Sequence, residues 1–288
     1  MPKTPASPIK SPEFREISPG VHIYIGGGGQ TNFGLILTGD KPVIIDSDMR
    51  VRKHFLKYMR GVTRKNAGLV LNTHHNFDHT SDNGYHVRRG AVTVGAGLIR
   101  QEMERELRRG SWAAALDKSG FHLGHLAPGL DFDPPMLTFD DRLEVRYGGR
   151  LFQLIRIGHC HTRGDSVIWM PEEKILFSGD LIANRSHTAT GQADLENWRR
   201  ELPRLKKFPA LRFIPGHGAL PTRGSKIVDE NITYFKNLRR RVAAALKKES
   251  SPQKAAALVQ MPECKGWTRP HNLAANALNM AKHLKKVG

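Results

Sequence analysis

Apolar residues are arranged along this chain in two patterns. Short apolar runs bounded by glycine and polar residues fill most of its length, and apolar positions three or four residues apart fill most of the remainder. Short bounded runs are typical of strands, whereas the wider spacing is typical of helices. The runs predict a strand, turn, strand, strand series within 21–48 and further strands at 67–71, 91–95, 136–139, 142–147, 151–157, 166–170 and 174–178. We assign the strands from 136 onward to a second half-sheet.

The helical spacing predicts helices at 49–60, 98–109, 194–206, 234–246, 252–259 and 272–286. Because strands alternate with helices, the fold class is α/β. The segment 110–135 is less regular, and we predict that it borders the substrate cleft and packs locally through Trp112, Phe121, His122, His125 and Phe132. The glycine run 26–29 predicts a mobile hairpin tip or lid edge. It is no phosphate loop, because no GK[ST] follows it.

Length and composition favour one domain with a full core, since the chain has 288 residues. Residues 1–19 are rich in proline and predict a flexible lead-in. The sequence shows neither a signal peptide nor an apolar stretch that could span a bilayer, so we expect a cytoplasmic protein without a membrane partner. The two cysteines, Cys160 and Cys264, do not suggest a disulfide framework, which fits a reducing compartment.

The charge balance is strongly basic, with 45 Lys and Arg against 27 Asp and Glu and a formal net charge of +18. Such a field favours an anionic small-molecule substrate or nucleic acid, although the alternative is charge spread over solvated helix faces. The best candidate surface for an anionic partner or a dimer contact is the basic face of the helical stretch from 234 onward, with Lys236, Arg239, Arg240, Lys247 and Lys248. The sequence carries no signal for the oligomeric state.

Candidate metal ligands follow the apolar run 67–71, in the segment Thr73-His74-His75-Asn76-Phe77-Asp78-His79. Others come later, each at the end of a predicted strand and close to glycine. Since open α/β sheets place binding sites at the carboxyl ends of strands, we expect these side chains to converge. Two divalent ions would find enough nitrogen and oxygen donors in His74, Asp78, His79, His161, Asp180 and His217. This donor set suits zinc, with iron or manganese as alternatives.

Five segments, in this order, resemble the signature of the metallo-β-lactamase superfamily. They are Asp46 for its structural aspartate, 74–79 for its HxHxDH motif, His161 for its third histidine, Asp180 for its bridging carboxylate and His217 for its final histidine. The resemblance runs from about Val21 to Leu220 and implies a four-layer αββα sandwich with additional C-terminal helices. It divides the chain into the lead-in 1–19, a metallo-β-lactamase-like domain at 20–222 and a helical extension at 223–288 packed on that domain. It also implies that Asp46 supports the metal-binding loop without touching metal.

One position departs from the motif, since Asn76 stands where the second histidine is expected. An amide oxygen is a weaker donor than imidazole, so the first metal site keeps only His74 and His161. The second site is complete, with Asp78, His79, Asp180 and His217. Three interpretations stay open: one ion in the second site, two unequal ions, or a protein that no longer catalyses. His75 and His159 are candidates to complete the first site, and ordinary loop hydrogen bonds are the alternative for both.

The resemblance implies hydrolysis by metal-activated water, with Asp78 as the catalytic residue that binds metal and orients the water. Our first expectation for the substrate is a carbonyl compound of the lactone, thioester or β-lactam class. The alternatives are a phosphodiesterase or nuclease acting on a nucleotide or nucleic acid, and a non-catalytic binding protein with a degenerate metal site. The fold does not decide between them. His187 is a candidate substrate contact.

Overall fold

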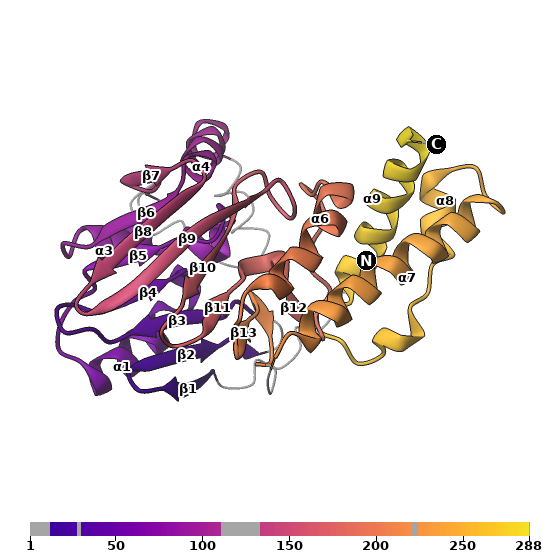
Figure 1. The fold of residues 1–288 in the computed structure, drawn as a ribbon. Helices are drawn as coiled ribbons and strands as arrows, with labels where there is room; N and C mark the ends of the chain where they lie inside the picture. Colours follow the sequence, from indigo (N-terminus) through magenta and orange to yellow (C-terminus); the bar gives the residue numbers. More distant parts are fainter. Residues whose placement is uncertain (1–11, 28–29, 111–132, 221–223, 288) are drawn as a thin grey trace.

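A computed structural model describes residues 12–27, 30–110, 133–220 and 224–287. Within these residues the strands form two large sheets and a two-stranded ribbon (Figure 1). The seven-stranded sheet is antiparallel up to its fourth strand and parallel beyond it. Its strands follow chain order: β1 (Glu13–Ser18), β2 (Val21–Ile25), β3 (Phe33–Ile36), β4 (Val43–Ile45), β5 (Leu69–Leu71), β6 (Val92–Ala96) and β7 (Leu137–Phe139).

The second sheet has five strands and is antiparallel except for the pair β11 and β13. In spatial order it consists of β13 (Arg212–Ile214), β11 (Ile175–Phe177), β10 (Asp165–Met170), β9 (Arg150–Gly158) and β8 (Arg142–Tyr147). The ribbon is a parallel pair of β12 (Ala183–Asn184) and β14 (His217–Gly218).

Helices make up the rest of the described fold. The α-helices are α1 (Arg52–Val62), α2 (Phe77–Thr80), α3 (Asn83–Val87), α4 (Gly97–Arg109), α6 (Leu195–Glu201), α7 (Lys226–Leu246), α8 (Pro252–Ala257) and α9 (His271–Val287). Short 3-10 helices are η2 (Met49–Val51), η4 (Gly179–Leu181), η5 (Leu202–Lys207) and η6 (Pro262–Cys264). No helix in the described part of the chain is both long and apolar enough to cross a membrane.

Alternating side chains on the strands explain the layers. In β4, Val43 and Ile45 join a core shared by both sheets, whereas Ile44 packs with α1 on the opposite face. In β10, Ile168 joins the shared core, whereas Trp169 packs under the C-terminal helices. Side chains of successive strand residues point to opposite faces, and the central strands of both sheets are buried on both sides. The predicted αββα sandwich with additional C-terminal helices is confirmed.

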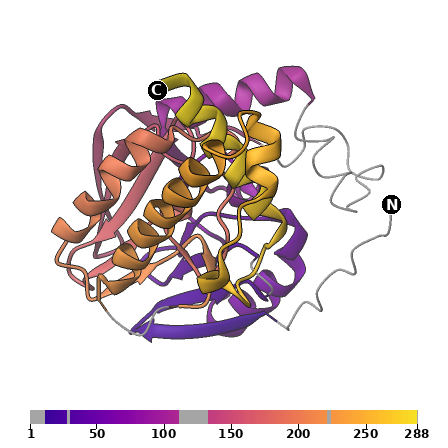
Figure 2. The same ribbon diagram turned by 90° about the vertical axis from the view of Figure 1, so that its right-hand side faces the viewer.

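The C-terminal helices cover the outer face of the five-stranded sheet. Figure 2 looks onto this layer, where the orange and yellow helices lie in front of the strands. Asn231 of α7 ties the layer to the ribbon, because its amide accepts a hydrogen bond from the Ala183 N–H (3.1 Å) and donates one to the Ala183 carbonyl (3.0 Å). One helix side chain thus takes the place of a neighbouring strand beside β12.

Three expectations from the sequence were wrong in detail. Residues 13–18 are not a flexible lead-in but the edge strand β1, whose Phe14 stacks on Tyr58. The strand at 137–139 belongs to the first sheet, because it pairs in parallel with β6. The helix expected at 194–206 changes at residue 202 from α6 to the 3-10 helix η5, where Pro203 has no N–H for an α-helical hydrogen bond. Part of the glycine run 26–29 and the aromatic and histidine residues predicted within 110–135 lie outside the described residues.

Candidate metal centre

The six candidate ligands come from loops and short elements that follow strands of both sheets. His74 follows β5, and Asp78 and His79 lie in α2 a few residues later. The second sheet supplies the rest, with His161 between β9 and β10, Asp180 in η4 after β11, and His217 in β14. All six side chains are at least largely buried; Asp78 is the most exposed, with 13% of its side chain accessible. The convergence expected from strand ends is therefore present.

Five of these residues have donor atoms at the spacing of a metal site: His161 Nε2 lies 3.4 Å from Asp180 Oδ2, and the other four make up the second site. The nearest distances between their donor atoms are 3.2 Å from His217 Nε2 to Asp180 Oδ1, 3.3 Å from His79 Nε2 to Asp180 Oδ1, and 3.5 Å from His217 Nε2 to Asp78 Oδ2. Donor atoms about 2.0–2.1 Å from a zinc ion in a tetrahedral site are about 3.3 Å apart. Asp78, His79 and His217 form one cluster with donor atoms within 4.8 Å, and His74, His79 and Asp180 form another. The residues present fit a divalent ion.

Hydrogen bonds to Asp46 and Thr73 orient two of the imidazoles. His79 Nδ1 lies 2.8 Å from Asp46 Oδ2, and because a carboxylate only accepts, Nδ1 carries the proton and Nε2 faces the cluster. The Thr73 hydroxyl donates to Asp46 (2.7 Å), so it accepts from His74 Nδ1 (3.0 Å). His74 Nε2 is buried in the cluster without a hydrogen-bond partner among the described residues, and a cation would satisfy it.

Two glycines let the second sheet's loops come close enough to position Asp180. Gly179 has φ 50°, and a Cβ there would lie 2.5 Å from Thr73 Oγ1. A Cβ on Gly216 would lie 2.1 Å from Asp180 Oδ1 and 2.7 Å from the Gly179 carbonyl carbon. The Gly216 N–H donates to the Gly179 carbonyl at 2.8 Å. Any larger residue at position 216 would displace the carboxylate.

Electrostatics within the cluster favour a cation. Burial alone would lower the pKa of His79, but the carboxylates of Asp46, Asp78 and Asp180 raise it well above its usual value. Burial would raise the pKa of Asp78, but His79, His217 and Arg50 hold it below its usual range. Burial, with help from His79, lowers the pKa of His74 well below its usual value. Since a bound metal would replace the proton that His79 carries on Nε2 when its imidazole is charged, metal affinity should fall as the solution is acidified.

The sequence analysis missed three supporting residues. Thr31 donates a hydrogen bond to Asp78 Oδ2 (3.0 Å), and Arg50 contributes positive charge near the same carboxylate. Asp165 accepts hydrogen bonds from the backbone N–H of His161 (2.6 Å) and Thr162 (2.9 Å), which fixes the His161 loop. Asp165 could have been noticed because it closes the segment 161–165 (HTRGD), which begins with the candidate ligand His161. Thr31 carried no signal in the sequence.

Several other candidates lie away from the cluster. His75 is buried and faces Glu106 (3.6 Å), and His159 hydrogen-bonds the Gln192 carbonyl (2.7 Å), so neither completes the first site. His187 hydrogen-bonds the Tyr234 hydroxyl (3.0 Å) and is buried, so it packs within the C-terminal layer and is not positioned to contact a substrate. Burial and the nearby Asp165 raise the pKa of Cys160, so this free thiol is a passive core side chain.

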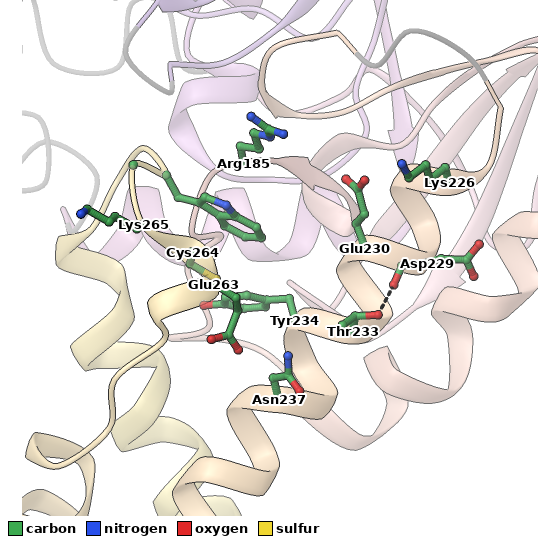
Figure 3. A pocket seen from close by; sticks show the side chains of 12 residues that line it. Arg185, Lys226, Asp229, Glu230, Thr233, Tyr234, Asn237, Glu263, Cys264 and Lys265 are labelled. Atoms are coloured by element: carbon green, nitrogen blue, oxygen red, sulfur yellow. Dashed lines mark hydrogen bonds between the residues drawn. The ribbon is translucent and has the colours of Figure 1, made fainter.

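A cavity of about 520 Å³ lies elsewhere, in the C-terminal layer (Figure 3). Its lining includes the stacked rings of Tyr234 and Trp267, whose centroids are 5.5 Å apart, together with charged side chains such as Arg185 and Lys265. None of the six candidate ligands lines it. The cavity is therefore separate from the cluster, although Arg185 directly follows β12.

Comparison with known proteins gives a consistent picture. The family model described as the Metallo-beta-lactamase superfamily matches residues 26–217. A curated relative, metallo-beta-lactamase type 2 from Bacteroides fragilis, is 36% identical over 89 residues, which are 29% of this chain and 36% of that protein. The beta-lactamase-like protein 2 homolog from Caenorhabditis elegans is 25% identical over 221 residues, which are 75% of this chain and 65% of that protein. The chain thus spans less than two thirds of the length of both relatives.

Solved structures extend the likeness to nearly the whole chain. A metallo-beta-lactamase family protein from Thermus thermophilus has a TM-score of 0.70 and 16% identity, covering 95% of each chain. The sec-alkylsulfatase Pisa1 from Pseudomonas sp. has the same TM-score and identity, covering 94% of this chain and 50% of that chain. At these identities the likeness concerns the fold.

Proposed function

This chain belongs to the metallo-beta-lactamase superfamily, a family of hydrolases, and from that premise we propose that it hydrolyses a small carbonyl substrate of the lactone, thioester or β-lactam class. The observation that supports a metal centre is the 3.2–3.5 Å spacing of donor atoms in the second site. We propose Asp78, His79, Asp180 and His217 as the ligands of a divalent ion, with zinc favoured by the mixed imidazole and carboxylate set. The names of the curated relatives favour a carbonyl substrate.

Each side chain around this site has a separate role in binding or orientation. A divalent cation, when bound, lowers the pKa of a water molecule and polarises the bond to be cleaved. Asp78 is the most exposed ligand, so substrate and water approach from its side. Thr31 holds the Asp78 carboxylate in one rotation, which lets Asp78 orient the attacking water. Asp46 accepts a hydrogen bond from His79 Nδ1–H, and this orients the ring so that Nε2 faces the cluster.

The test is Asp78→Ala in metal-defined buffer. Metal content and hydrolysis of a lactone, a thioester, a β-lactam and a phosphodiester are measured on both proteins. We expect hydrolysis of at least one carbonyl compound by the unmodified protein and loss of both metal and activity in the variant. His159→Ala is the matched control, because His159 bonds only a loop carbonyl in the described structure. An unchanged rate in Asp78→Ala would refute the assignment.

A phosphodiesterase or nuclease activity is the second candidate, and the distribution of charge supports it. Exposed cations gather on the C-terminal layer, whereas its exposed acidic residues are few. On α6, α7 and α9, and in the turn after α7, these cations are Arg199, Arg200, Lys236, Arg239, Arg240, Lys247, Lys248, Lys282, Lys285 and Lys286. A surface of this kind attracts nucleic acid or a nucleotide through its phosphates.

Salt dependence separates the two candidates. If the layer binds nucleic acid, affinity for a labelled single-stranded oligonucleotide should fall steeply as salt rises, and a double change of Arg239→Glu and Arg240→Glu should weaken it further. Lys53→Glu is the control, since Lys53 is exposed on α1 in the opposite layer. Binding that is weak, independent of salt and equal in all three proteins would exclude this candidate.

A further inference from the structure

We propose that this chain binds a single metal ion, because Asn76 closes the neighbouring first site by hydrogen-bonding the metal-facing nitrogen of His161. The inference rests on the proposed function, since it requires the second site to hold an ion. It concerns Asn76, the position at which this chain departs from the family motif. It also narrows the three interpretations left open by the sequence to one.

The proton on His161 is placed by its neighbours. His161 Nδ1 lies 2.9 Å from the Ala189 carbonyl oxygen, which only accepts, so Nδ1 is protonated and Nε2 carries the lone pair. Asn76 Nδ2 lies 2.8 Å from that Nε2. A flipped amide would put two acceptors face to face at this distance, which is repulsive. The Asn76 amide therefore donates to His161 Nε2.

The distance distinguishes a hydrogen bond from shared metal binding. Two ligands of one zinc ion would have donor atoms about 3.3 Å apart. The pairs in the second site have separations of 3.2–3.5 Å, and His161 Nε2 lies 3.4 Å from Asp180 Oδ2, whereas Asn76 Nδ2 and His161 Nε2 are 2.8 Å apart. The shorter value is that of a hydrogen bond. The lone pair that a first ion would need is already in use.

Too few donors remain for an ion at the first site. With His161 occupied, the site retains His74 and a share of the Asp180 carboxylate. Zinc sites that act on substrates hold the ion with three protein ligands. His75 and His159 cannot help, since they face Glu106 and the Gln192 carbonyl respectively. The second site, in contrast, keeps all four of its donors.

The experiment counts ions. The protein and its variants are loaded with excess zinc, freed of unbound metal by gel filtration, and analysed by native mass spectrometry and elemental analysis. We expect one ion per unmodified chain and two in Asn76→His, which removes the donor and adds an imidazole. Two matched variants place the ion without creating a site. His161→Ala should keep one ion, whereas His217→Ala, which removes one of the four donors of the second site, should bind the ion more weakly and lose it during gel filtration.

The possible counts have different meanings. Two ions in the unmodified protein, or loss of the ion in His161→Ala, would overturn the single-ion inference and leave the metal-dependent function standing. No ion in the unmodified protein would overturn both. One ion in a folded Asn76→His would refute Asn76 as the residue that closes the site. Circular dichroism establishes folding, and if Asn76→His is unfolded, the pair His161→Ala and His217→Ala decides.

Discussion

The two halves of the metal cluster are positioned by different means. On the first sheet, side chains hold the ligands, since Asp46 bonds both His79 and Thr73, and Thr73 in turn bonds His74. On the second sheet, the backbone does most of this, since Gly179 and Gly216 bring two chain segments into contact around Asp180. The first half thus depends on charge and hydrogen bonds, whereas the second depends on the absence of side-chain volume. Substitutions that add side-chain volume without removing a charge or a hydrogen bond should therefore be harmful mainly in the second half.

The largest expected effect comes from Gly216→Ala. The added Cβ would lie 2.1 Å from Asp180 Oδ1 and would displace the carboxylate. We expect zinc affinity to fall by about 100-fold or more, beyond the loss typical of a supporting contact. Competition with a chromogenic chelator measures it. Gly191→Ala is the control, because nothing in the described structure lies within 4 Å of the Cβ it would add.

A smaller effect is expected from Asp46→Asn in the first half. The amide keeps an oxygen for the Thr73 N–H but loses the negative charge that holds the His79 Nδ1 proton. Removal of such a supporting group costs about 10- to 100-fold in metal affinity. The same chelator competition tests this, and a change of less than threefold would show that this half, too, is positioned by backbone.

Thr31→Val should have a weaker effect that appears in turnover. The change keeps the shape of the side chain and removes its hydrogen bond to Asp78. A hydrogen bond to a charged carboxylate contributes about 1.5 kcal/mol or more, so we expect about a tenfold lower kcat with little change in metal content. Thr233→Val is the control, since Thr233 is exposed on α7 and bonds only a helix carbonyl in the described structure.

The smallest effect on metal is expected from Asp165→Asn. This buried carboxylate accepts backbone hydrogen bonds as Asp46 does, but it holds the loop of His161, which we infer binds no ion. We expect the free energy of unfolding to fall by about 1–3 kcal/mol, while zinc affinity stays within threefold. Urea titration and chelator competition measure the two quantities. A 10-fold loss of zinc affinity would place His161 among the ligands and contradict the single-ion inference.

Much of the site could be predicted from the sequence because ligand chemistry is local. Histidine and aspartate after apolar runs indicated the six candidates, the family resemblance added Asp46, and the structure brings these residues together. The function of Asn76 could not be predicted, since its donor role depends on the tautomer of His161 and hence on the distant Ala189 carbonyl. Thr31 was missed for the same reason, because a hydroxyl has no significance until the fold places it beside Asp78.

The fold was predictable to a similar degree. Short apolar runs bounded by glycine and polar residues predicted most strands, because a strand buried on both faces is apolar throughout. It could not place β7 in the first sheet, since pairing partners depend on which edge is free. It also missed β1, whose sequence is mostly polar on its exposed face and gains its place through Phe14 and Ile17.

Through Asn231, the C-terminal helices help to hold the metal ligands in place although they supply no candidate ligand themselves. Its amide closes one edge of the ribbon that runs from Ala183 beside Asp180 to His217. In a recombinant fragment that ends before α7, the N–H and carbonyl of Ala183 would lose their hydrogen bonds to Asn231. The loops that carry Asp180 and His217 would then be less firmly held together. Shortening this protein to its sandwich would therefore be expected to yield a chain that folds poorly and releases its cation during purification.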